Sequence, residues 1–261
     1  MDELQGLNLI NVNGEYRGII ERNFYSPNAD KYIIHYKTPN GYDKTDMTSE
    51  HFKLFKSYVK IKSDRYDIIK SKDIKHIYHF SPIQNAPSIL ETGIVSRKLA
   101  KLSQIPIVTT DPNRFDGKLD MISASISFPN YKMLYKLTMN GMTLVICDIS
   151  PRILLSKLDT EFYYTNAASL DFQFYDSEDL QTNEAFLSMF DKKNRDPGIP
   201  NNYPTDPQAE ILVNNIIKKD FINEIIIPGH DNCLEKLCND KGMNYVITKS
   251  LHKPRCDWSR W

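Results

Sequence analysis

The stretch Ile122-Ser123-Ala124-Ser125-Ile126-Ser127-Phe128 alternates strictly between apolar residues and serines. Because successive side chains of a β-strand point to opposite faces, the alternation predicts a strand that turns Ile122, Ala124, Ile126 and Phe128 toward a core. The three serines then share the other face. Serine hydroxyls suit a polar cleft and a solvated sheet face equally well, so the pattern by itself leaves both interpretations open.

Segments typical of strands and helices surround this stretch, from residue 73 to the carboxyl terminus. The expected strands are Ile77–Ser81, Ile122–Phe128, Thr143–Ile149, Ala209–Val213, Glu224–Ile227 and Tyr245–Thr248. The expected helices are Asn85–Thr92, Pro129–Leu137, Asp179–Phe190 and Asn232–Asn239. No regular helical crossovers separate the strands, which disfavours a doubly wound parallel sheet. We therefore expect an α+β domain of two small packed β-sheets with helices at the rim.

The first 60 or so residues have a separate, turn-rich β pattern. Gly14–Asn23 and Lys31–Lys37 are strand-like, and Pro39-Asn40-Gly41 is typical of a hairpin turn because Asn-Gly supplies positive φ. The order of these segments resembles the SH3 and Tudor-like small barrels, which often bind nucleic acid or peptides, although a structural or dimerising role fits as well. We expect this module over residues 1–60, a charged connector over 61–72 and the α+β domain over 73–261.

Composition restricts the class of protein. A chain of 261 residues, 41% hydrophobic and 25% charged, can bury one substantial core and still form a small module. The formal net charge is zero, yet Lys and Arg concentrate between Lys53 and Lys75, which suits a solvated face or a phosphate contact. Met1-Asp2-Glu3 lacks the features of a signal peptide and no apolar run would span a bilayer, so we expect a cytoplasmic protein with no membrane partner.

The four cysteines have irregular spacings, which indicate neither a disulfide framework nor a zinc site, so no metal is expected. Two other titratable residues have unusual positions. His79 lies on an expected strand, where a lone histidine is more often a core residue than a ligand contact. Glu210 faces away from the apolar side of the strand Ala209–Val213. A carboxylate near a core needs a partner or a purpose, and an ion pair or a catalytic role would each satisfy that need.

Five segments, in order, resemble the DarT family of DNA ADP-ribosyltransferase toxins across roughly residues 73–250. They are Tyr78-His79-Phe80-Ser81 with Asn85 and Ile89–Gly93, Arg114-x-Asp116, the run at 125–133, Asn166-Ala167-Ala168, and Gln208–Val213. Two features depart from the best-known members. Tyr164-Thr165 precedes Asn166 where those members have Asp-Gly, and the amino-terminal module is extra. The resemblance implies the ADP-ribosyltransferase fold.

The resemblance also implies an activity and a set of site residues. It implies that NAD⁺ is the co-substrate, without a metal, and that the acceptor is a thymine or guanine base of single-stranded DNA. It assigns His79 to the adenosine ribose, Arg114 to the pyrophosphate and reaction centre, and Glu210 to the nicotinamide ribose and acceptor base. The remaining residues that it implies are Ser81, Asn85 and Gly93 for NAD⁺, and Tyr131 and Asn166 for the substrate. Because the acidic front half of the loop after Asn166 should repel phosphate, we expect the strand contacts from Lys192, Lys193 and Arg195.

The chemistry of these residue types agrees with such roles. Cleavage of a glycosidic bond develops positive charge on the ribose, so a carboxylate such as Glu210 stabilises the transition state more than the ground state. The same carboxylate can take a proton from the attacking base. An arginine such as Arg114 suits a pyrophosphate because its planar fork stays charged.

Residues between Asn166 and Glu210 would form the loop that shapes acceptor choice. Its aromatic residues Phe172, Phe174 and Tyr175 suit base stacking and also suit the core of an irregular loop. The resemblance further implies a macrodomain-type antitoxin partner in a toxin–antitoxin or phage-defence system. An ADP-ribosyltransferase that acts on RNA or protein, and a catalytically silent nucleic-acid-binding protein, remain alternatives.

Overall fold

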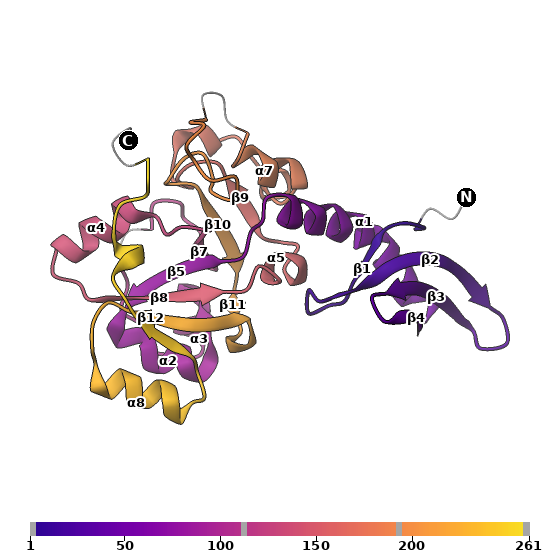
Figure 1. Cartoon of the computed structure of the whole chain (residues 1–261), viewed down its shortest axis with the longest axis horizontal. Helices are drawn as coiled ribbons and strands as arrows, with labels where there is room; N and C mark the ends of the chain where they lie inside the picture. Colours follow the sequence, from indigo (N-terminus) through magenta and orange to yellow (C-terminus); the bar gives the residue numbers. More distant parts are fainter. Residues whose placement is uncertain (1–3, 111–113, 192–194, 258–261) are drawn as a thin grey trace. The chain divides into compact units, whose positions relative to one another are not determined.

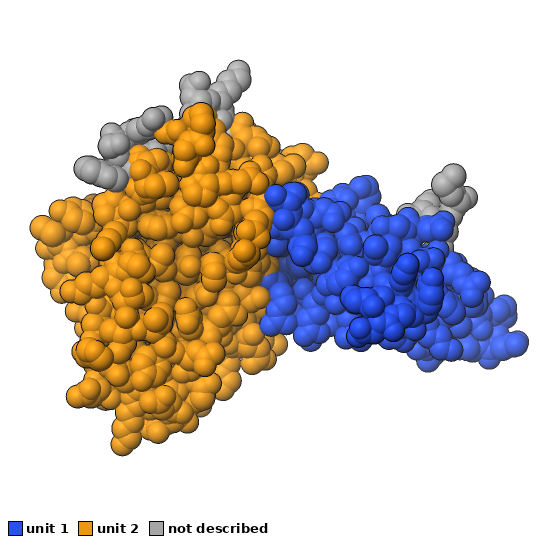
Figure 2. Space-filling model, in the orientation of Figure 1, with its two compact units in different colours: residues 1–71, 152–158 blue, residues 72–151, 159–261 orange. Residues whose placement is uncertain are grey.

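The computed structural model describes residues 4–110, 114–191 and 195–257 (Figure 1). The chain forms two compact units, Met1–Ser71 with Arg152–Leu158 and Lys72–Pro151 with Asp159–Trp261, coloured separately in Figure 2. It therefore passes between the units after Ser71, after Pro151 and again after Leu158. The first unit is not a continuous piece of the sequence.

The first unit contains a four-stranded antiparallel sheet in the order β1-β2-β3-β4. Its strands are β1 Asn8–Ile10, β2 Tyr16–Ser26, β3 Lys31–Thr38 and β4 Gly41–Met47. Thr38 pairs with Gly41 at the hairpin that Asn40-Gly41 predicted, and Gly41 has a φ of 132°. Ile20, Ile34 and Tyr36 are buried on the core side of this sheet.

A long helix, α1 Ser49–Ser71, follows the sheet. Residues 61–71, which were expected to form a charged connector, therefore belong to this helix. Phe52 and Val59 bury an apolar stripe in the sheet's core, and the Phe52 ring stacks on Tyr32 with ring centres 3.8 Å apart. Fully buried Arg65 donates from Nη1 to the Leu154 carbonyl at 3.1 Å, which fastens residues 152–158 to this unit.

The second unit is built on a seven-stranded sheet in the order β13-β12-β8-β5-β7-β10-β9, which confirms the α+β class. Its strands are β5 Ile77–Pro82, β7 Met121–Ile126, β8 Leu144–Ile149, β9 Glu161–Tyr163, β10 Glu210–Asn214, β12 Ile222–Ile227 and β13 Tyr245–Ile247. The first part of β7 pairs with β10, and its last residues, Ser125 and Ile126, pair with β5. The strands expected in two small sheets therefore join through β7. A separate two-stranded sheet pairs β6 Ile94–Val95 with β11 Ile216–Ile217.

Helices cover both faces of this sheet. The α-helices after α1 are α2 Ala86–Thr92, α3 Arg97–Leu102, α4 Tyr131–Met139, α5 Ile153–Ser156, α6 Ser177–Leu180, α7 Asn183–Ser188 and α8 Asn232–Asp240. The 3-10 helices among the described residues are η1 Ile83–Asn85, η2 Leu170–Phe172, η3 Lys219–Phe221 and η4 Ser250–His252. Leu134 and Leu137 of α4 pack on Leu144 and Ile146 of β8. Cys147, whose side chain points to the other face of β8, lies near Cys238 of α8.

The helix expected over Asp179–Phe190 is interrupted. The first piece ends at Leu180, and Thr182 caps the second, because its hydroxyl accepts a hydrogen bond from the Ala185 N–H at 3.1 Å. In the described ranges no helix is long and apolar enough to cross a membrane.

Candidate active site

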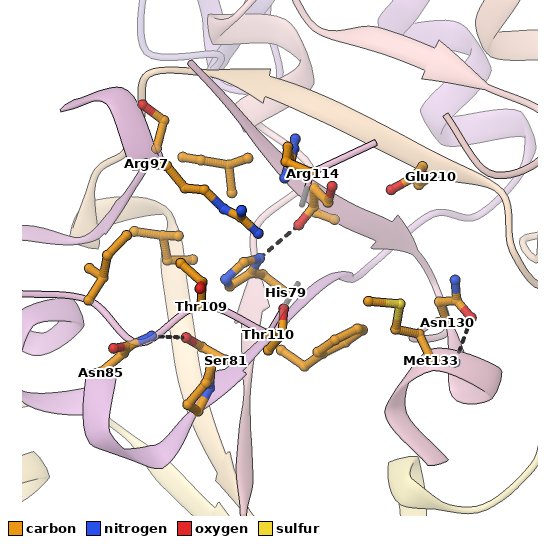
Figure 3. Close-up of a pocket in the computed structure, with 18 of the residues that line it drawn as sticks. His79, Ser81, Asn85, Arg97, Thr109, Thr110, Arg114, Asn130, Met133 and Glu210 are labelled. Atoms are coloured by element: carbon orange, nitrogen blue, oxygen red, sulfur yellow. Dashed lines mark hydrogen bonds between the residues drawn. The ribbon is translucent and has the colours of Figure 1, made fainter. Parts of the chain in front are cut away.

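A cavity of about 560 Å³ opens in the second unit beside β5 and β7 (Figure 3). It brings together seven of the residues that the sequence singled out: His79, Ser81, Asn85, Gly93, Arg114, Asn166 and Glu210. Ser123 and Ser125 also line it. The serine face of β7 is therefore a polar cleft at these two positions, which decides between the two interpretations of the alternation.

Glu210 opens β10 and pairs with Tyr163 of β9. Its Oε1 accepts a hydrogen bond from the Ala167 backbone N–H at 2.6 Å, and the Ser123 hydroxyl donates another. Burial raises the pKa of this carboxyl, Asp116 raises it further, and the two hydrogen bonds and Arg114 oppose the rise. The carboxylate is thus oriented by neutral donors and faces the cavity.

Arg114 lies on the loop that leads to β7 and has an unusual φ of 43°. Its Nε donates to Asp116 Oδ1 at 2.8 Å and its Nη2 to the Met121 carbonyl at 3.2 Å. In the Arg-x-Asp pattern, the aspartate therefore orients the guanidinium of the arginine two residues before it. Arg114 also acts electrostatically on His79 and Glu210, lowering the pKa of both.

His79 is on β5, and its Nδ1 lies 2.7 Å from the Ser123 carbonyl oxygen. A carbonyl oxygen only accepts, so Nδ1 carries the hydrogen and Nε2 is the acceptor of the neutral ring. Burial lowers the pKa of this imidazole, and Arg114 lowers it further, while the bond to Ser123 raises it. His79 therefore offers an uncharged acceptor nitrogen to the cleft (Figure 3).

Ser81, Asn85 and Gly93 shape the neighbouring wall. Asn85 Nδ2 donates to Ser81 Oγ at 2.9 Å (Figure 3). It also donates to the Val108 carbonyl, and its Oδ1 accepts from the Val108 N–H. The Asn85 side chain makes no capping hydrogen bond to α2 and instead holds the segment around Val108. Gly93 has a φ of 90°, and a Cβ there would meet the Ile217 carbonyl oxygen at 2.3 Å, so only glycine fits.

Asn166 begins the turn whose backbone donates a hydrogen bond to Glu210. Its Oδ1 accepts from the Ala168 N–H at 2.9 Å, which shapes the turn and aims the Ala167 N–H at the Glu210 carboxylate. The Asn166-Ala167-Ala168 segment thus connects the end of β9 to the site.

The structure does not place the other substrate candidates in the cavity. Tyr131 is buried at the start of α4, and the cavity is lined instead by its neighbour Asn130. The Arg195 guanidinium donates to Thr205 Oγ1 and to the Pro200 carbonyl, so it holds its own loop. Lys192 and Lys193 lie outside the described residues.

Several lining residues were not anticipated from the sequence. They include Arg97, Thr109, Thr110, Asn130 and Met133 (Figure 3). Ser96, which caps α3 by accepting from the Leu99 N–H, is the sequence signal that places Arg97 at the start of a helix. Thr109 and Thr110 lie in an irregular segment for which no periodic pattern exists.

A buried network behind Glu210 was also missed. Glu161 Oε2 accepts from Lys118 Nζ at 2.5 Å and from the Tyr163 hydroxyl at 2.6 Å. Lys118 follows Arg114 on the same loop, and its N–H donates to Asp116. The ion pair therefore ties the arginine-bearing loop to β9.

Buried Arg255 holds the segment that leads into β10. It pairs with Asp257 and donates to the carbonyls of Pro204 and Thr205. All four cysteines are free thiols. Within the described part of the chain, no three His, Cys, Asp or Glu residues are grouped so as to hold a metal ion.

A carboxylate, an arginine and a neutral histidine lie around one cavity on this α+β sheet. The family profile of DarT, described as ssDNA thymidine ADP-ribosyltransferase, matches residues 78–248. The chain belongs to the DarT family.

One solved structure with a TM-score above 0.5 supports the fold. DarTG of Thermosipho africanus, in complex with ADP-ribose, is 21% identical with a TM-score of 0.53, and the match covers 68% of this chain and 51% of that one. This chain thus spans about half the length of the Thermosipho protein. DarT of Thermus sp. 2.9 in complex with NAD⁺ is 15% identical with a TM-score of 0.46, and the match covers 69% and 98% of the two chains. Among curated proteins, none matches significantly.

Proposed function

We propose that the protein transfers ADP-ribose from NAD⁺ to a base of single-stranded DNA, with Glu210 as the catalytic carboxylate. The observation that carries the proposal is the setting of Glu210, which faces the cavity and is oriented by the Ala167 N–H and the Ser123 hydroxyl beside Arg114. We assign the reaction to residues 73–261 and targeting to the amino-terminal module.

The lining residues suit NAD⁺ as the co-substrate. Neutral His79 offers Nε2 as an acceptor for a hydroxyl of the adenosine ribose, while Arg114 offers charge to the pyrophosphate. Ser81, Asn85 and Gly93 shape the wall on the His79 side, and Gly93 lets the Ile217 backbone pack closely against this wall. A cavity of about 560 Å³ is in the range of small-molecule and cofactor sites.

In the proposed reaction the bond between the nicotinamide nitrogen and ribose C1′ breaks, and nicotinamide leaves with the electron pair. Positive charge then develops on the ribose, where the Glu210 carboxylate stabilises it. A ring nitrogen of the acceptor base forms the new bond to C1′, and Glu210 takes the proton that this nitrogen loses. The raised pKa of Glu210 makes it a better base than an exposed glutamate.

Two strongly exposed aromatic rings are available to stack on the acceptor base. Phe115, which lines the cavity, is 79% exposed, and Phe174 is 88% exposed. Stacking on such rings attracts every base, and only an unpaired base enters such a pocket, which favours single strands. Phe172 is a core residue between Tyr163 and Leu180, so it is not available for stacking. Tyr131, Asn166, Lys192, Lys193 and Arg195 remain the proposed substrate-side residues.

The family suggests a physiological setting. We propose that the protein is the toxin of a toxin–antitoxin or phage-defence system, that it acts in the cytoplasm where NAD⁺ and DNA are present, and that a macrodomain-type antitoxin reverses the modification.

The test is incubation of the purified protein with NAD⁺ labelled in its ADP-ribose part and with separate pools of single-stranded DNA, double-stranded DNA, RNA and protein. We expect label on single-stranded DNA, with release of one nicotinamide for each modified base. Label confined to RNA or to protein would replace the proposed acceptor. The absence of NAD⁺ consumption with every pool would favour a catalytically silent nucleic-acid-binding protein.

A further inference from the structure

One face of the amino-terminal sheet has a composition that the proposed reaction does not use. We call it the outer face: the side of β2, β3 and β4 that is turned away from the core residues Ile20, Ile34 and Tyr36. The register places Arg22 opposite His35 and His35 opposite Lys44, and it places Lys37 opposite both Ile19 and Tyr42. Side chains directly opposite each other project on the same face.

The outer face is basic in a chain whose net charge is zero. Arg22, Lys37 and Lys44 are all exposed. Asp46 is the acid among the paired positions of this face, and Lys31 Nζ lies 2.6 Å from its carboxylate. That ion pair compensates the acid, so three cations remain for an anionic partner.

Aromatic rings lie between these cations. The Phe24 and His35 rings stack with centres 5.7 Å apart, and the Arg22 guanidinium carbon lies 5.8 Å from the centre of the Phe24 ring. Phe24 is 42% exposed and Tyr42 is 74% exposed. Exposed Ile19 adds to the apolar area. A merely solvated sheet face would carry short polar residues in place of exposed rings.

From this arrangement we propose that the outer face binds single-stranded DNA, with Phe24 and Tyr42 stacking on bases and with Arg22, Lys37 and Lys44 contacting phosphates. Alternating rings and cations on an open β-surface match the alternating bases and phosphates of a single strand. A duplex hides its bases from such rings. The inference rests on the proposed function for its choice of DNA, since the acceptor is proposed to be single-stranded DNA.

The test measures binding of the full-length protein to a fluorescein-labelled oligothymidine by fluorescence anisotropy, at several salt concentrations and without NAD⁺. In the variant R22Q/K37Q/K44Q we expect at least about a tenfold loss of affinity at low salt. Each phosphate contact to a single strand contributes about 0.7 to the slope of log K against log salt, so this slope should fall by about 2.

A second variant tests the rings. Tyr42→Ala should weaken binding by about fivefold or more at every salt concentration, because stacking does not depend on salt. Tyr42→Phe keeps the ring and should bind normally. Tyr42 is the most exposed of these rings, so its substitution leaves the fold intact even if the triple variant does not fold. Circular dichroism checks each variant.

The matched control removes three lysines from α1 of the same unit, in the variant K53Q/K60Q/K70Q. We expect its affinity and salt slope to stay close to those of the unchanged protein. The proposal is overturned if this control loses more affinity than R22Q/K37Q/K44Q, or if R22Q/K37Q/K44Q and Tyr42→Ala both bind normally. Tighter binding to oligouridine of the same length would overturn DNA as the partner.

Failure of this inference is distinguishable from failure of the proposed function. Binding that depends on the outer face, in a protein that modifies no DNA, would uphold the inference and refute the proposed function. If the protein modifies DNA and the outer-face variants bind DNA normally, the proposed function is upheld and this inference is refuted.

Discussion

At the residue scale, the arrangement around Glu210 predicts how one substitution separates binding from chemistry. Glu210→Gln keeps the shape and can still accept from the Ala167 N–H, but it removes the charge and the basicity. We expect transfer to fall by about 10²–10⁴-fold, as is typical for the loss of an acid–base group, while NAD⁺ affinity changes little. The measurements are single-turnover transfer and calorimetric NAD⁺ binding. Glu184→Gln, an exposed residue of α7, is the matched control and should leave both unchanged.

Arg114→Ala should behave differently from Glu210→Gln. The guanidinium is proposed to contact the pyrophosphate in the ground state as well as in the transition state, so its loss should weaken NAD⁺ binding by at least about tenfold and lower turnover too. Calorimetry on the folded variant gives the affinity. Normal NAD⁺ affinity in Arg114→Ala would show that the arginine is oriented by Asp116 for a purpose other than binding the dinucleotide.

The pKa of Glu210 predicts the pH dependence of transfer. The carboxylate must be ionised to act, and burial raises its pKa above the ordinary value of glutamic acid. Transfer should therefore rise with pH through this raised pKa, which places the acidic limb of the kcat profile at a higher pH than an exposed glutamate would. The profile is measured with saturating NAD⁺ and DNA. If the acidic limb of the profile lies at the ordinary glutamate pKa, or if it persists in Glu210→Gln, the limb reports the ionisation of another group.

At the element scale, the tie between the Arg114 loop and β9 has a predictable effect on stability. Glu161→Gln removes the buried partner of Lys118, whose own side chain is 27% exposed, so we expect a loss of about 1–2 kcal/mol, less than for a fully buried pair. Urea denaturation measures this free energy of unfolding. Asp120→Asn, which breaks the exposed pair with Lys98, should cost less than about 0.5 kcal/mol.

Sequence patterns predicted those elements in which local periodicity and burial coincide. The alternation over Ile122–Phe128 indicated β7 because its apolar side is buried in the sheet. Helix α1 was missed because lysines on its exposed surface obscured a buried stripe that includes Phe52, Val59 and Ile68. Lys118 and Glu161 are 43 residues apart, and nothing local marks either as the partner of the other. The placement of Glu210, His79 and Arg114 around one cavity was anticipated through family resemblance rather than through periodicity.

At the scale of the whole molecule, the two units differ in what their removal should do. We expect NAD⁺ cleavage to survive deletion of residues 1–71, since every residue that lines the cavity belongs to the second unit. The deletion also exposes to solvent the side chains of Ile153, Leu154 and Leu155, which are buried within the first unit. The shortened chain should therefore aggregate unless these three are made polar.

With Ile153, Leu154 and Leu155 replaced by serine, the chain that begins at Lys72 should stay monomeric in light scattering. It should cleave NAD⁺ and require more DNA for half-maximal transfer. A monomeric, folded chain that has lost NAD⁺ cleavage would instead make the amino-terminal unit part of the catalytic machinery.

The discontinuous first unit also affects the order of events during synthesis. Residues 1–71 leave the ribosome first, but the piece that completes their unit, Arg152–Leu158, follows only after about 80 further residues. At roughly 5–20 residues per second, this delay is about 4–16 s. The amino-terminal sheet therefore remains without residues 152–158 while β5, β7 and β8 are synthesised. The first unit can therefore be completed only after β5, β7 and β8 have been synthesised, and β5 and β7 line much of the cleft. The strand β10, which carries Glu210, is synthesised later still.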